Sequence, residues 1–169
     1  MSRVGSRNAG LPTHVLWERD GIVSTSLPAN HEEDLAADLR WIEERVCTWS
    51  WYIETKVLRG ELYEALDALQ YLRDNVLFKV LALQREERPS AARRVEARTG
   101  VWTNQFAETV PVLSRESTMN ALQAIMALYQ VLADPLLDRY ELEISAKARQ
   151  AVLVAMEAGL AWSPADYRN

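Results

Sequence analysis

Two cations stand one helical turn apart directly before a glycine, in the order Lys56, Arg59, Gly60. Residues upstream continue the same stripe at spacings of three or four, and such positions share one face of a helix. The stripe mixes cations with aromatic rings and comprises Arg45, Trp49, Tyr52, Lys56 and Arg59. Cations can hold a phosphate and rings can stack on a base, so these residue types predict a site for a nucleotide or another anion.

A second polar stripe with the same spacing follows the glycine: Tyr63, Asp67, Gln70 and Asp74. Two helices joined by so short a turn pack antiparallel, so the two stripes can border one groove. In this hypothesis Lys56 and Arg59 bind the phosphate, and the groove is lined by Trp49, Tyr52, Tyr63 and Asp67. The alternative is a pair of solvated helix faces, whose cations interact with the negative end of the helix dipole. Physical arguments by themselves favour this alternative.

A different site is conceivable near the N-terminus, where Gly5 and Ser6 precede Glu18 and Asp20. A Gly-Ser turn can hold phosphates, and two carboxylates one residue apart can hold Mg²⁺ on a triphosphate. However, no apolar strand precedes Gly5, Asp20 stands in an expected turn, and no third carboxylate follows on a strand. We therefore predict neither a metal site nor catalytic residues in this chain.

Histidine and cysteine offer little further chemistry. The two histidines, His14 and His31, have no partners at the spacing of a hydrolase site or a zinc site, and we interpret them as surface residues. The single cysteine, Cys47, falls inside an expected helix and is interpreted as a small buried apolar residue.

Helices must position these residues, since apolar residues recur every three or four positions over most of the chain. We predict a mainly all-α fold, a four- to five-helix up-down bundle with a small N-terminal β-hairpin. The domain covers 13–160, between tails at 1–12 and 161–169. Its predicted parts are a hairpin at 13–27, a long helical hairpin at 30–59 and 61–88, and C-terminal helices within 114–158.

The composition excludes some functional classes. The formal net charge is −5, which does not favour nucleic-acid binding, because neutralising phosphates requires a basic surface. No run of eighteen apolar residues is present, so we expect no membrane span. The first ten residues lack the apolar core of a signal peptide, and we expect a cytoplasmic protein.

The run from Thr48 to Leu83, TWSWYIETKVLRGELYEALDALQYLRDNVLFKVLAL, resembles the C-terminal helical region of small nucleotidyltransferases. These include aminoglycoside and lincosamide adenylyltransferase-like proteins. The resemblance rests on an aromatic cluster, a lysine, an Arg-Gly-Glu turn and an acidic helix ending in Arg-Asp. The matching residues are Trp49, Trp51, Tyr52, Lys56, Arg59, Gly60, Glu61, Glu64, Asp67, Arg73 and Asp74. The segment THVLWERDGIV also resembles the last strand and turn of the catalytic domain that precedes this region.

The resemblance implies a helical domain on the substrate and nucleotide side of a nucleotidyltransferase-like protein. The Gly-Ser turn and the three carboxylates of the catalytic domain have no match here, so independent catalysis is not expected. Lys56 and Arg59 would belong to the surface facing nucleotide phosphates. Mg²⁺ and ATP would be bound only if a separate catalytic domain is supplied.

Two other functions remain open. One is a complete nucleotidyltransferase acting on a small molecule such as an aminoglycoside, with Glu18 and Asp20 as metal ligands. The other is a structural interaction module. A homodimer is expected, because Val15, Trp17 and Ile22 would leave an apolar hairpin exposed beside a missing partner.

Overall fold

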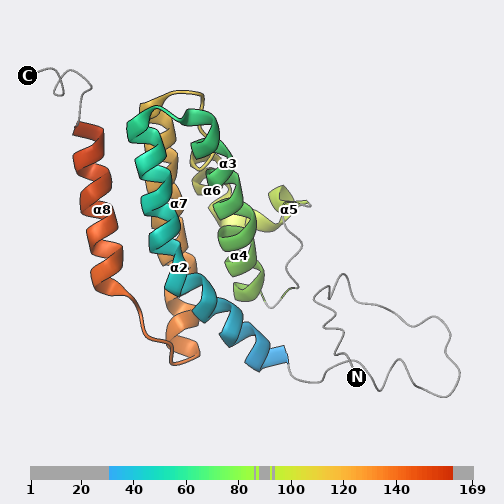
Figure 1. Ribbon diagram of the computed structural model, residues 1–169. Coiled ribbons are helices and arrows are strands. Elements are labelled where there is room, and N and C mark those ends of the chain that lie inside the picture. The colour runs from blue at the N-terminus through green and yellow to red at the C-terminus, as the bar shows by residue number, and fades with distance from the viewer. Residues whose placement is uncertain (1–30, 86, 88–91, 93, 162–169) are drawn as a thin grey trace, which may run out of the picture.

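The computed structural model describes residues 31–161, except 86, 88–91 and 93. This part of the chain is a bundle of helices without strands, which confirms the all-α prediction (Figure 1). The predicted hairpin at 13–27, the tail at 1–12 and nearly all of the tail at 161–169 lie outside the described residues. The candidate metal ligands Glu18 and Asp20 lie there too.

The first two long segments of the described chain form a helical hairpin. Helix α2 covers His31–Arg59 and ends at Gly60, whose φ of 78° is the left-handed conformation that glycine adopts without strain. The Gly60 amide donates to the Val57 carbonyl, and the Glu61 amide donates to the Lys56 carbonyl. These bonds satisfy carbonyls that the helix end would otherwise leave unpaired and reverse the chain.

The second arm of the hairpin differs from the continuous helix predicted over 61–88. It consists of α3 (Leu62–Leu72), a π-helical turn η1 (Arg73–Leu77) and α4 (Phe78–Gln84). The wider turn brings both Val76 and Leu77 into the core, while the Arg73 side chain reaches the Thr109 carbonyl. Tertiary contacts thus set the local helix type, which apolar periodicity could not specify.

The remaining described elements are three short helices and two long ones. The short ones are α5 (Val95–Thr99), η2 (Gly100–Trp102) and α6 (Thr103–Glu108). The long ones are α7 (Arg115–Arg139), capped by the Ser114 side chain, and α8 (Ala146–Ala161). Helix α7 continues past Pro135, although a proline inside a helix removes one backbone hydrogen bond.

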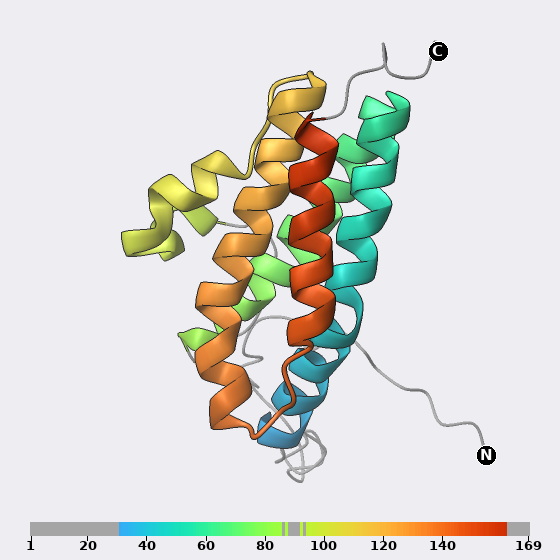
Figure 2. The same ribbon diagram turned by 90° about the vertical axis from the view of Figure 1, so that its left-hand side faces the viewer.

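Helix α7 is central and packs against α2, α3, α4, α6 and α8. Its buried side chains include Leu122, Ile125 and Tyr129, each fully inaccessible. Helix α8 packs on α2 and α7, on the side away from α3 and α4 (Figures 1 and 2). The α2–α3 corner, the start of α7 and the end of α8 therefore meet at one end of the bundle, which we call the corner end.

Candidate functional site

The two cations of the predicted phosphate site are already paired with carboxylates. The Lys56 Nζ lies 2.6 Å from Glu61 Oε2 and 2.5 Å from Glu64 Oε2. The Arg59 Nε and Nη2 lie 2.8 and 2.5 Å from Glu61 Oε1. Two positive side chains thus face two negative ones, so this corner offers an incoming phosphate little net positive charge.

The protonation of this cluster follows from its hydrogen bonds. The hydrogen bonds that the Lys56 ammonium donates to Glu61 and Glu64 hold the pKa of Lys56 above its ordinary value. Hydrogen bonds from Lys56 and Arg59 hold the Glu61 pKa below its ordinary value. Both shifts favour the charged forms, so the cluster is an ion-pair network that stabilises the turn around Gly60.

The predicted aromatic lining is brought together only in part. Trp49 contacts Tyr71 edge to face, with ring centroids 5.3 Å apart, and Lys56 lies over the Tyr52 ring at 5.2 Å. No hydrogen bond, ion pair or ring contact between described residues joins α2 to Tyr63 or Asp67, and both are exposed. The seam with α3 instead uses Glu64 and Tyr71, which lie on a neighbouring face of that helix.

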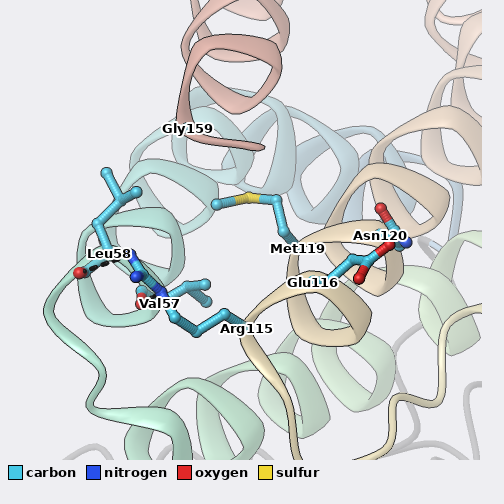
Figure 3. Close-up of a pocket in the computed structure, with 7 residues that line it drawn as sticks. All are labelled: Val57, Leu58, Arg115, Glu116, Met119, Asn120 and Gly159. Atoms are coloured by element: carbon cyan, nitrogen blue, oxygen red, sulfur yellow. Dashed lines mark hydrogen bonds between the residues drawn. The ribbon is translucent and has the colours of Figure 1, made fainter. Parts of the chain in front are cut away.

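A pocket of about 420 Å³ opens at the corner end, between three helices (Figure 3). Val57 and Leu58 come from the last turn of α2, Gly159 comes from α8, and the start of α7 provides the rest. Leu58 and Met119 lie on facing sides beneath the end of α8 (Figure 3). The lining residues on α7 are Arg115, Glu116, Met119 and Asn120. A volume of this size can hold a small organic molecule.

Arg115 connects two walls of this pocket. Its Nε donates to the Val57 carbonyl at 3.2 Å and its Nη2 to the Leu58 carbonyl at 2.9 Å. The guanidinium thus satisfies two carbonyls at the end of α2 and holds α7 against it. Arg115 therefore has a structural role, while Glu116 and Asn120 present exposed polar groups at the pocket.

Glu54 lies directly behind the pocket, and sequence analysis missed it. Its side chain is buried with 5% exposure, and its Oε2 has no hydrogen-bond partner within the part of the chain that the structure describes. A Cβ atom added to Gly159 would lie 3.4 Å from Glu54 Oε1, Leu58 Cδ2 and Met119 Cε. Burial raises the pKa of the Glu54 carboxyl above its ordinary value. The sequence signal for Glu54 is its spacing: it lies one helical turn before Val57 and Leu58. This spacing places its carboxyl on a face of the helix that packs inward.

A second buried carboxylate, Glu43, is fully paired. The Arg149 Nη2 and Nε lie 2.6 and 3.1 Å from Glu43 Oε2 and Oε1, and the Tyr129 hydroxyl donates to Oε2 at 2.5 Å. Arg149 also donates to Asp134 at 2.5 Å, and the Ser145 amide donates to Glu43 at 2.9 Å. This network attaches the first turn of α8 to α2 and α7.

Comparisons with known proteins identify no relative: no protein-family model matches the chain, and neither a curated protein nor a solved structure is significantly similar to it. Among the described residues, no cluster of three or more His, Cys, Asp or Glu side chains could hold a metal ion. None of the helices in the same part of the chain is long and apolar enough to cross a membrane.

Proposed function

We propose that this chain is the helical, acceptor-side domain of a nucleotidyltransferase-like protein, whose chemistry requires a separate catalytic domain. The resemblance of Thr48–Leu83 supports the family, and the antiparallel helices around Gly60 are compatible with it. The pocket at the corner end carries the argument for the acceptor side. It has the size of a small-molecule site and lies beside the turn that the resemblance places at the binding surface.

The charges around the pocket favour an organic cation over a phosphate. The helices α2 and α8 both end there, and a helix C-terminus carries a partial negative charge. Glu116 adds a full negative charge at the rim. The start of α7 and Arg115 oppose these charges, but the Arg115 guanidinium already donates to two carbonyls. An acceptor with protonated amines, such as an aminoglycoside, is therefore the occupant we propose.

Nucleotide binding at Lys56 and Arg59 stays the alternative. The ion pairs with Glu61 and Glu64 weigh against it, since a phosphate would have to displace a carboxylate from each cation. It becomes the better hypothesis if a titration with ATP shifts signals around Gly60 and these responses disappear in a Lys56→Ala/Arg59→Ala variant.

The test is a heteronuclear NMR titration of the full chain with kanamycin, and separately with ATP. We expect kanamycin to shift the backbone signals of Glu116, Asn120 and Gly159 with a Kd of about 1 mM, since the catalytic domain would supply further contacts. ATP should leave these signals unchanged. A kanamycin response spread over all acidic surface residues, or none at several times this concentration, would refute the acceptor-side proposal.

A further inference from the structure

The two ends of α8 are attached to the bundle with unequal strength. At its first turn Arg149 is 4% exposed and bonded to Glu43 and Asp134. Val152 and Met156 then bury apolar side chains. Beyond Met156, the described side chains of Glu157 and Ala158 are exposed, and Gly159 contributes no side chain. Local stability follows buried contacts, so the segment after Met156, judged by its described side chains, should open more readily than the start of α8.

The end of α8 covers Glu54, whose Oε2 has no hydrogen-bond partner among the described residues. Burying a polar atom without a partner is unfavourable, so covering Glu54 opposes closure of α8. The charged residues that α7 and α8 carry at the corner end are Arg115 and Glu116 at the start of α7 and Glu157 near the end of α8. None of the three contributes to the raised Glu54 pKa, for which burial is the cause. The carboxyl therefore has no counter-charge within the described structure.

Resting on the proposed function, we infer that Glu54 is the buried partner of an ammonium group of the acceptor, and that the last turns of α8 move aside to admit it. An ammonium group would supply both the counter-charge and the hydrogen bonds that Glu54 lacks. Neighbouring Leu58 and Met119 would contact the apolar part of the ligand. Glu54 then selects cations over neutral molecules, because an uncharged ligand leaves the carboxyl unpaired.

Low pH should favour the closed position of α8 over Glu54. Burial raises the pKa of Glu54 above 4.5 only while α8 is closed, so the closed state binds the proton more tightly than the open one. Closure is thus favoured as pH falls, and is weakened as pH rises through the raised pKa. The wild type should therefore open its last turns more often at pH 8 than at pH 5.

The first experiment uses the ligand-free full chain, so it does not depend on the proposed function. Hydrogen exchange of α8 is measured from pH 5 to pH 8 and corrected for the intrinsic rate. We expect opening after Met156 to increase at least about fivefold in the wild type and to stay level in Glu54→Gln, which cannot ionise. Glu143→Gln, which removes an exposed carboxylate at the far end of α8, is the matched control and should follow the wild type. If opening after Met156 depends on pH equally in all three proteins, the inference that the last turns of α8 move to uncover Glu54 is wrong.

The second experiment measures kanamycin binding to the same three proteins. Glu54→Gln should weaken binding about tenfold or more, and Glu143→Gln should leave it unchanged. If the wild type binds at the pocket but Glu54→Gln binds equally well, this inference fails and the proposed function survives. If the wild type does not bind while exchange still depends on Glu54 and pH, the cover exists but the proposed function fails, and with it the role of Glu54 as a ligand partner.

Discussion

At the scale of single residues, the pairing of buried charges decides stability. Among the described residues, only Arg149 forms an ion pair with Glu43, and both side chains are about 5% exposed. Replacing Arg149 by methionine removes the cation but leaves the carboxylate buried. We expect the free energy of unfolding in urea to fall by about 3–5 kcal/mol.

The double variant Glu43→Gln/Arg149→Met separates pairing from packing. It removes the carboxylate charge as well, so it should be more stable than Arg149→Met alone. If the double variant loses as much as the sum of the two single changes, the two charges act independently and the network argument is wrong.

At the scale of elements, the two glycines of the corner end have opposite expected effects. Gly60 has a φ of 78°, which strains any residue with a Cβ atom, so Gly60→Ala should cost about 1–2 kcal/mol. Gly159 lies in ordinary helical backbone, and its added methyl group would contact Glu54, Leu58 and Met119 at 3.4 Å. Gly159→Ala should therefore stabilise the fold by about 0.5–1 kcal/mol, as thermal unfolding can measure.

The Gly159→Ala variant also tests whether the last turns of α8 must move for a ligand to bind. A methyl group at Gly159 strengthens the closed position of α8, so kanamycin binding should weaken although the fold gains stability. If neither Gly60→Ala nor Gly159→Ala changes the thermal stability, then backbone strain at Gly60 and close packing at Gly159 do not contribute to it.

At the scale of the whole molecule, an apolar loop suggests self-association. Val110, Val112 and Leu113 are 64%, 71% and 52% exposed and lie together between α6 and α7. Exposed apolar side chains gathered in one loop can form an interface between two copies of the chain. We expect light scattering at micromolar concentration to report a particle of twice the chain mass of 19.2 kDa.

Matched surface variants distinguish this loop from other apolar positions. The double variant Val112→Ser/Leu113→Ser should return the protein to a monomer. Val101→Ser, at a position 84% exposed on another part of the surface, should have no effect. A wild-type particle of 19.2 kDa would rule out the homodimer at that concentration.

The sequence by itself determined the helices and the turn between the first two. Apolar spacing depends only on nearby residues, and the positive φ at Gly60 is a local property of glycine. Local signals therefore predicted α2 almost to its ends. They also placed Tyr52 and Lys56 on one face of α2, where the Lys56 ammonium lies over the Tyr52 ring.

Only the tertiary structure decided which charges are paired and where the chain is hollow. Glu43 and Arg149 are 106 positions apart, so no local pattern could join them. The same holds for the pocket, whose walls come from the ends of α2, α7 and α8. The predicted site was placed at Lys56 and Arg59 because their charges are visible in the sequence. Their ion pairs, and the buried carboxyl of Glu54 beneath α8, arise only when the helices pack.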